Sequence, residues 1–297
     1  MAFFIEKGHW NNFCYRRLEQ LGKTFRMKKI CIVSLLALLC SCNTLNQESV
    51  LYPNSMNLVE NTPLINDYGK TVLERFDAPL GYSRVTVLPN TFQHFLRTLR
   101  LKPEGAMVQF YDGKTKPNNN VYVSVVDLPI SRQNVQMSSD SVIRLISEFL
   151  YKNAEYDKIA FHANKERLSF KDFAKDDFSR KNFEAYMDYA MEKISTPSFC
   201  TDLKHVSLKD IKIGDIFVQN TQPNGHAVIV VDLVENTKGE KLFLLAQGFQ
   251  PAQEIQILAN PSQDDISPWY ALKEGELLTP EWRFMTSDLM RFVFLQH

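Results

Sequence analysis

The sequence predicts an α+β fold in which helices pack on a central antiparallel sheet. An amphipathic helix is indicated near the middle of the chain, where apolar residues recur at the spacing of one helix face: Val142, Ile143, Leu145, Ile146, Phe149 and Leu150. Several strand candidates then follow one another towards the C-terminus. A mixed first half that leads into a meander of strands is typical of α+β proteins and not of alternating βαβ units.

The elements predicted in the first half of the domain are short. Runs of apolar and alternating residues predict strands over residues 72–75, 83–88, 106–111 and 121–128. A helix is predicted over Phe92–Leu99, because Asn90 or Thr91 can cap its first turn and Lys102-Pro103 follows its end.

The second half begins with the long helix, which is predicted to open at Ser138-Ser139-Asp140. A strand over 158–162 follows, and then one or two helices within 169–194 that end before Pro197. The meander is predicted to consist of strands over residues 215–219, 226–233, 242–247 and 254–258. Thr237–Glu240 has the composition of a turn between the second and third of them.

The N-terminal region has the pattern of a bacterial lipoprotein signal peptide. Lys28 and Lys29 precede an apolar run of about ten residues, and small residues then lead into Cys42. The run is too short to span a bilayer, which needs roughly 20 apolar residues. The resemblance to a lipobox implies cleavage before Cys42 and lipidation of its thiol, which would anchor the protein in a membrane leaflet. A buried helix or a plain transmembrane anchor is the alternative.

These features divide the chain into four parts. A signal peptide normally begins at its charged region, so residues 1–26 are interpreted as a mis-annotated extension before Met27. Residues 27–41 are the expected signal peptide and residues 42–67 a polar tether. Residues 68–297 are expected to form a single α+β domain. We therefore expect a lipid-anchored protein of the bacterial cell envelope, on the periplasmic face of the outer membrane or on the cell surface.

Charge and cysteine content exclude several classes of protein. The chain has 34 basic and 34 acidic residues, and removing the seven basic and two acidic ones of residues 1–41 leaves 27 and 32, a net charge of −5. Nucleic-acid binding requires clustered Lys and Arg, so no nucleic-acid partner is expected. Only Cys200 remains after Cys42, so an intrachain disulfide framework is not expected.

A pair of motifs in the C-terminal third of the chain indicates a candidate catalytic site. Ile213–Gln219 contains a Gly-Asp pair that opens a strand, and Gly225–Asp232 contains a Gly-His pair that opens an apolar strand. This pattern resembles the papain-like NlpC/P60 hydrolases, which cut peptide or amide bonds, often in peptidoglycan. The resemblance implies a papain-like domain with His226 as general base, a nucleophile at the start of an upstream helix, and a polar residue on the next strand that orients the imidazole.

Gln247 is the residue that strand pairing predicts for this orienting role. In a hairpin around Thr237–Glu240, residue 228 faces about residue 247, so His226 and Gln247 become diagonal neighbours on one face. A slip of one residue would put them on opposite faces. Asp232 is excluded as the partner, because six residues along a strand span about 20 Å.

Seven short segments together resemble one family: 92–97, 101–103, 111–113, 225–227, 245–248, 251–255 and 267–270. Through them, residues 72–297 are similar to an uncharacterised family of bacterial lipoproteins, domain-of-unknown-function family 4846. The resemblance implies Cys-Ala-Asp at the start of the long helix, where this chain has Ser138-Ser139-Asp140. Ser138 therefore occupies the position of the expected nucleophilic cysteine.

Each candidate residue also has a structural interpretation. Ser138 can be a helix N-cap, His226 a hydrogen-bonded core or turn histidine, and Gln247 a structural amide. Cys200 lies between the helices and His226 in chain order and is interpreted as a buried small hydrophobe. His94 and His162 have no partner at metal-ligand spacing, so no metal and no cofactor are expected.

The sequence thus leaves three functions open. The first is a binding module or pseudoenzyme that has lost its nucleophile and keeps a cleft for a peptidoglycan peptide or a protein. The second is an amide or peptide hydrolase of cell-wall peptides that uses Ser138, His226 and Gln247. The third is a structural envelope protein with protein partners only.

Overall fold

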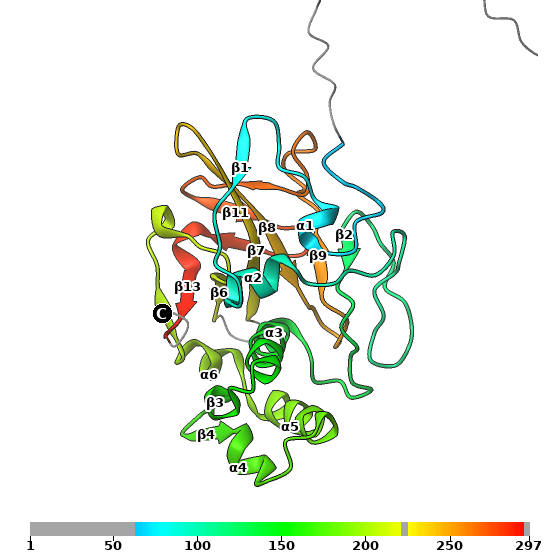
Figure 1. The fold of residues 1–297 in the computed structure, drawn as a ribbon, viewed down its shortest axis with the longest axis vertical. Coiled ribbons are helices and arrows are strands. Elements are labelled where there is room, and N and C mark those ends of the chain that lie inside the picture. The colour runs from blue at the N-terminus through cyan, green and yellow to red at the C-terminus, as the bar shows by residue number, and fades with distance from the viewer. Residues whose placement is uncertain (1–62, 221–224, 294–297) are drawn as a thin grey trace, which may run out of the picture. The chain divides into compact units, whose positions relative to one another are not determined.

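A nine-stranded sheet organises the computed structural model, which describes residues 63–220 and 225–293 (Figure 1). Every strand pair in it is antiparallel. Seven strands follow one another across the sheet: β2 (Tyr122–Val125), β9 (Gln256–Leu258), β8 (Lys241–Gln247), β7 (His226–Asn236), β6 (Ile216–Gln219), β13 (Leu289–Phe292) and β5 (Leu203–His205). Two more pair beside this row, β1 (Tyr82–Arg84) with β7 and β10 (Tyr270–Ala271) with β8. The architecture is therefore α+β with a large antiparallel sheet.

The helices gather around one helix that packs on the middle of the sheet. That helix is α3 (Ser138–Lys152), which contacts β7 and β8. The other helices are short, apart from α5: α1 (Val72–Arg75), α2 (Phe92–Arg97), α4 (Phe170–Ala174), α5 (Arg180–Lys193) and α6 (Thr196–Cys200). Two small hairpins complete the fold: β3 (Ala160–Ala163) with β4 (Glu166–Ser169), and β11 (Glu276–Leu278) with β12 (Arg283–Met285). In Figure 1 the hairpin β3–β4, α4 and α5 lie together below α3.

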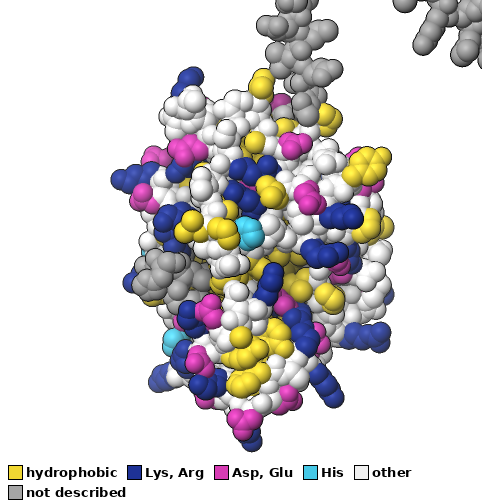
Figure 2. Space-filling view, viewed as in Figure 1, with side chains coloured by type: hydrophobic (Ala, Val, Ile, Leu, Met, Phe, Trp, Pro, Cys, Tyr) yellow, Lys and Arg dark blue, Asp and Glu magenta, His cyan; other side chains and the backbone are white. Residues whose placement is uncertain are grey.

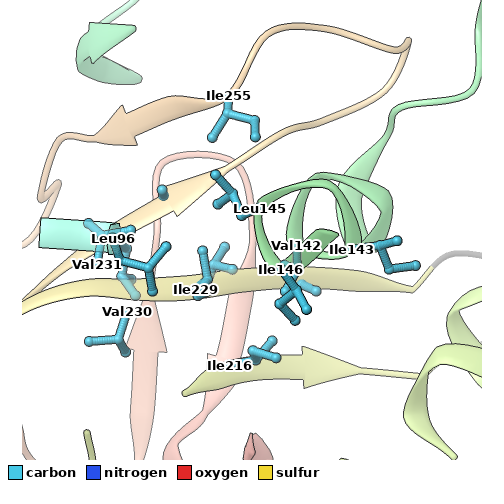
Figure 3. Packing of buried hydrophobic residues seen from close by; sticks show 14 of the residues in the cluster. Leu96, Val142, Ile143, Leu145, Ile146, Ile216, Ile229, Val230, Val231 and Ile255 are labelled. Carbon is cyan, nitrogen blue, oxygen red and sulfur yellow. The ribbon is translucent and has the colours of Figure 1, made fainter. Parts of the chain in front are cut away.

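The apolar side of α3 faces the sheet, as its sequence pattern predicts. Figure 3 shows Val142, Leu145 and Ile146 of this helix among side chains of the strands, with Ile229 of β7 close by. All four are at most 1 % exposed. Full burial of one such side chain contributes about 1.5–3 kcal/mol. This packing fixes where the first residue of α3 lies relative to the start of β7.

Most predicted elements are confirmed, and two are corrected. The long helix, the helix over Phe92–Arg97 with Thr91 as its N-cap, and the four strands of the meander are present with shifts of a few residues at their ends. Residues 72–75 form a helix and not a strand. Thr71 accepts a hydrogen bond from Glu74 N, and Glu74 accepts one from Lys70 N, which is the capping pattern of a helix start.

Residues 106–111 form isolated bridges and not the predicted strand. Their backbone donors are used by side chains and by a local turn, because Val108 N donates to the Tyr122 hydroxyl and Gln109 N to the Glu254 carboxylate. The predicted extension, signal peptide, Cys42 and all but the last five residues of the tether lie outside the described residues. Of those five, Leu64 O accepts from Asp77 N and Ile65 bridges to Phe76.

A buried ion-pair cluster ties β1 and α2 to β7. The Asp232 carboxylate is fully buried and accepts from Arg84 Nε at 2.8 Å and from Arg97 Nε at 2.7 Å. Arg97 also donates to the carbonyls of Val85 and Leu233. Asp232 is therefore a structural anion, a role that the sequence analysis did not predict when it excluded this residue as the partner of His226.

Replacing Asp232 by Asn is expected to lower the free energy of unfolding by about 3–5 kcal/mol, because it leaves two arginines at a buried position without their anion. Urea denaturation measures this change. Asp127→Asn is the matched control, since Asp127 is half-exposed and lies 3.9 Å from an exposed Arg100. The control should cost less than about 1 kcal/mol, and equal losses for the two variants would contradict the role given to Asp232.

Candidate functional site

Ser138, His226 and Gln247 lie in one hydrogen-bonded row. Ser138 Oγ is 2.7 Å from His226 Nδ1, and His226 Nε2 is 2.9 Å from Gln247 Oε1. The three residues come from the first position of α3, the first position of β7 and the last position of β8. The structure thus brings together all three residues that the sequence singles out.

A bulge in β7 gives His226 and Gln247 their common face. Near the hairpin turn Glu235 pairs with Lys241, but beyond an irregularity at Val231 the register moves by one residue and Ile229 pairs with Ala246. The shifted register places residue 228 opposite Gln247, as predicted. With the register of the turn end, Gln247 would be opposite Ile229 and would face away from His226.

Two glycines allow the close packing around the row. Gly248 follows Gln247, and a Cβ at this position would lie 1.9 Å from Ser141 Oγ on α3. Gly225 precedes His226, and a Cβ there would lie 2.8 Å from Thr196 Cγ2 and 2.9 Å from Gln219 O. The Gly-His and Gln-Gly pairs of the sequence therefore serve a steric purpose, because any side chain would push α3 or α6 away from the strands.

Glu281 fixes the orientation of the Gln247 amide. Gln247 Nε2 donates to Glu281 Oε2 at 2.6 Å, and a carboxylate can only accept in this contact. Gln247 Oε1 must then face His226 and accept from Nε2–H, which leaves Nδ1 of the neutral imidazole as an acceptor for the Ser138 hydroxyl. The row is therefore polarised in one direction, from Ser138 towards Glu281.

Lys116 binds the Glu281 carboxylate that orients Gln247. Its Nζ lies 2.6 Å from Glu281 Oε2 and 3.1 Å from Gln253 Oε1. Burial lowers the pKa of the Lys116 ammonium, while the Glu281 carboxylate acts in the opposite direction. Sequence analysis missed both residues, because Lys116 lies in an irregular segment and Glu281 in the turn between β11 and β12, where no periodicity marks them.

Three aromatic rings enclose the imidazole. Phe249, Trp282 and Phe284 have ring centroids 4.9, 5.2 and 5.7 Å from that of His226, which is 1 % exposed. This burial lowers the pKa of His226 to about 4, while the hydrogen bond to Gln247 raises it and the nearby Lys116 ammonium lowers it. The histidine is consequently neutral at pH 7, in the protonation state that a general base needs.

Ser138 is the first residue of α3, and its N-cap is Met137, so the alternative of a Ser138 N-cap is corrected. The hydroxyl does not bond the free N–H groups of its own helix. It contacts His226 and accepts from Ala227 N at 2.9 Å. The capping contact comes from Asp140, whose Oδ2 accepts from Met137 N. The N-terminal end of α3 leaves partial positive charge beside Ser138.

Cys200 and His162, two other residues that the sequence analysis considers, lie apart from this row, as does Trp269 of the segment 267–270. Cys200 is a half-buried free thiol, and burial raises its pKa. Trp269 is fully buried and donates to Asp77 O, so it belongs to the core. His162 has a partner that the sequence did not indicate, since Nδ1 lies 2.5 Å from Asp202 Oδ1. Within residues 63–220 and 225–293 no cluster of His, Cys, Asp and Glu is arranged to hold a metal ion.

The fold and the row define an α+β domain that presents a serine, a histidine and a glutamine at the junction of one helix and two strands. The chain matches the family described as domain of unknown function (4846) over residues 72–178 and 164–291, and it belongs to that family. No curated protein and no solved structure matches it.

The depressed pKa of His226 predicts an acid-sensitive fold. The unfolded chain binds a proton on this histidine below pH 6.5, whereas the folded chain binds it only near pH 4. Acid therefore favours unfolding within this window, by up to about 3 kcal/mol from this group, and the effect vanishes above pH 6.5. Urea denaturation from pH 7 to pH 4 should show a smaller loss of stability for His226→Gln than for the wild type. Parallel pH profiles would contradict the assignment.

Gly248→Ala is expected to lower the free energy of unfolding by about 1–3 kcal/mol, because the new methyl group collides with Ser141 Oγ. Thermal unfolding measures this cost. In a Ser141→Ala background the penalty should shrink, since the colliding atom is gone and only the Ser141 Cβ at 3.0 Å remains. An identical penalty in both backgrounds would show that α3 and β8 do not meet as described.

Proposed function

We propose that this domain is an acyl hydrolase of amide or peptide bonds with Ser138 as nucleophile, His226 as general base and Gln247 as the residue that orients the imidazole. The observation that carries the proposal is the 2.7 Å contact between Ser138 Oγ and the unprotonated Nδ1 of His226. A hydroxyl within hydrogen-bond reach of a base that is itself oriented by a third group is the usual arrangement for nucleophilic catalysis.

The chemistry would proceed through an acyl-enzyme. Ser138 Oγ attacks the carbonyl carbon while its proton moves to His226 Nδ1, and the imidazolium then gives that proton to the leaving amine as the amide bond breaks. Water, deprotonated by the same nitrogen, releases the acyl group and restores the serine. Free N–H groups in the first turn of α3 are suited to stabilise the oxyanion that forms beside Ser138.

The architecture that we propose is papain-like, of the NlpC/P60 type. It is supported by the order of the parts along the chain: a nucleophile that begins a helix, then a base that begins a strand, then an amide that ends the next strand. Ser138 stands at the position where the family pattern implies cysteine. A hydroxyl is a poorer nucleophile than a thiolate and needs a stronger base, so this substitution predicts slow turnover.

The proposed membrane anchor suggests which class of substrate the hydrolase could reach. The signal-peptide pattern that ends at Cys42 supports a lipid-anchored envelope protein, and the amide-rich polymer within reach of such an anchor is the peptide part of peptidoglycan. None of the helices among the described residues is long and apolar enough to cross a membrane. We therefore propose cell-wall peptides as the substrates.

A binding module that has lost catalysis is the second candidate, and the enclosure of the site favours it. His226 is almost completely buried, a base with a pKa of about 4 is weak at pH 7, and Ala227 N already donates to Ser138 Oγ. In this alternative the row is a structural remnant and the surface around it holds a cell-wall peptide or a protein. A purely structural envelope protein with protein partners only would lack both cleavage and peptide binding.

The test compares the purified wild type with Ser138→Ala, Ser138→Cys, His226→Ala and Gln247→Ala. Peptidoglycan fragments and p-nitrophenyl acetate are the substrates, with products followed by mass spectrometry and absorbance, and a fluorophosphonate probe reports an activated serine. We expect kcat/KM to fall by at least about 10³-fold without Ser138 or His226. Loss of Gln247 should cost about 10²-fold, since it only positions the base.

Ser139→Ala is the matched control, because this neighbouring hydroxyl lies 3.4 Å from Thr196 Oγ1 and has no part in the row. It should keep wild-type activity and labelling. A folded wild type that neither cleaves nor reacts with the probe would refute the hydrolase. If Ser138→Cys then cleaves, the domain is a hydrolase scaffold without its nucleophile, as the second candidate requires.

A further inference from the structure

A cavity of about 950 Å³ lies between two segments that the proposed hydrolase does not use. One wall is Val85–Gln93, which leads from β1 into α2, and the other is Lys204–Asp215, which leads from β5 into β6. Its size lies within the range of sites for small organic ligands. In Figure 1 these are the cyan and yellow-green segments to the left of α2.

The cavity is distant from the serine site. Leu233 of β7 lies on its wall, and seven residues of extended strand, about 23 Å, separate Leu233 from His226. Neither Ser138 nor Gln247 lines it. A ligand here would therefore not touch the proposed nucleophile, so the two sites can be tested separately.

The two walls differ in chemistry. The first wall is apolar or uncharged, with Val85, Val87 and Leu88, and the Leu88 side chain is 70 % exposed. The second wall and its neighbour β8 carry the positive charge: Lys204, Lys209, Lys212 and Lys241. Figure 2 shows dark blue and yellow side chains next to one another on the left of the molecule, with magenta acidic side chains among them. A ligand that fills the cavity must therefore offer negative and apolar groups on opposite sides.

Most of this positive charge is not neutralised within the protein. Asp215 is paired with Arg291, and Lys241 donates to a backbone carbonyl, that of Lys209. Over the described part of the chain the ammonium groups of Lys204, Lys209 and Lys212 form no salt bridge, and that of Lys212 interacts only electrostatically with the Asp215 carboxylate. Asp210 is the other acidic residue of this wall. Residues 42–297 as a whole carry a net charge of −5, so a cationic cavity departs from the average of the chain. Concave sites of one sign concentrate ligands of the opposite sign.

We propose that this cavity binds a short acidic peptide, with its carboxylates on the lysine wall and its apolar side chains on Val85, Val87 and Leu88. A flat bilayer cannot enter a concave site, which argues against a membrane surface as the occupant. The aromatic residue of the cavity, Phe92, is 3 % exposed and offers no face on which a nucleobase could stack. An extended peptide with alternating acidic and apolar residues presents its two kinds of side chain on opposite sides, as the walls require.

The experiment measures binding of a fluorescein-labelled octapeptide of alternating glutamate and leucine to the full chain, by fluorescence anisotropy. We expect binding that weakens as salt is raised from 50 to 500 mM, since exposed charges are screened. The combined variant Lys204→Gln, Lys209→Gln, Lys212→Gln should lower affinity by about 10-fold or more, at a few-fold for each exposed charge. Leu88→Ser should lower affinity a few-fold without changing the salt dependence.

Lys238→Gln is the matched control, because Lys238 is an exposed lysine of the β7–β8 turn and does not line the cavity. It should leave affinity unchanged, as should Ser138→Ala, so that failure of the hydrolase and failure of this site are distinguishable. Circular dichroism verifies that the variants are folded. The proposal is overturned by absence of peptide binding, by equal affinity of the triple variant and wild type, by equal binding of a glutamine–leucine peptide, or by binding only to vesicles of anionic phospholipid.

Discussion

Strand β7 changes its register with β8 at Val231, and the arrangement of the site follows from that irregularity. Asp232 immediately follows the bulge and is held in place by Arg84 and Arg97, which reach it from β1 and α2. A buried carboxylate with two cations is costly to move, so it fixes the strand where the register changes. The shifted register then places His226 and Gln247 on one face. The ion cluster therefore lies about 20 Å along β7 from His226, next to the residue where the register that aligns His226 with Gln247 is set.

A polar relay of Gln247, Glu281 and Lys116 lies behind His226 and fixes which way the buried Gln247 amide points. An amide alone can present either its oxygen or its nitrogen to the imidazole, and only one choice makes Nδ1 an acceptor. Glu281 removes this ambiguity by accepting from Gln247 Nε2, and Lys116 in turn compensates the charge of Glu281. Burial lowers the pKa of both Lys116 and His226, which keeps the imidazole neutral, while the Glu281 carboxylate 2.6 Å from Lys116 Nζ opposes the effect on the ammonium.

The sequence predicted those parts of the molecule that local pattern determines. Apolar periodicity located α3, and a Gly-His pair together with the expected pairing of the hairpin placed His226 and Gln247 on one face, in the register that the structure has. Prediction from the sequence failed where residues distant in the chain accept the backbone hydrogen bonds. In residues 106–111 the backbone N–H groups donate to the side chains of Tyr122 and Glu254 and not to a neighbouring strand. Prediction also missed Glu281 and Lys116, which lie 165 residues apart and meet only in the folded chain. The helix over 72–75 was predictable in principle, because Thr71 and Glu74 form a capping pair that outweighs the strand-like composition.

The apolar surroundings of His226 are more compatible with a serine than with a cysteine at the start of α3. A thiol paired with an imidazole reacts through a thiolate–imidazolium pair, which a pocket that lowers the histidine pKa to about 4 disfavours. A serine hydroxyl stays neutral in the resting state and so fits the apolar surroundings of Phe249, Trp282 and Phe284. In the proposed hydrolase the imidazolium would form only while Ser138 is deprotonated during acyl transfer, where Gln247 Oε1 faces it and the Glu281 carboxylate lies one hydrogen bond beyond. Because the Gln247 amide separates the Glu281 carboxylate from the ring, that carboxylate would stabilise the imidazolium less than a direct contact would. The activation free energy of the proposed acyl transfer would therefore depend on how strongly Gln247 is polarised by Glu281.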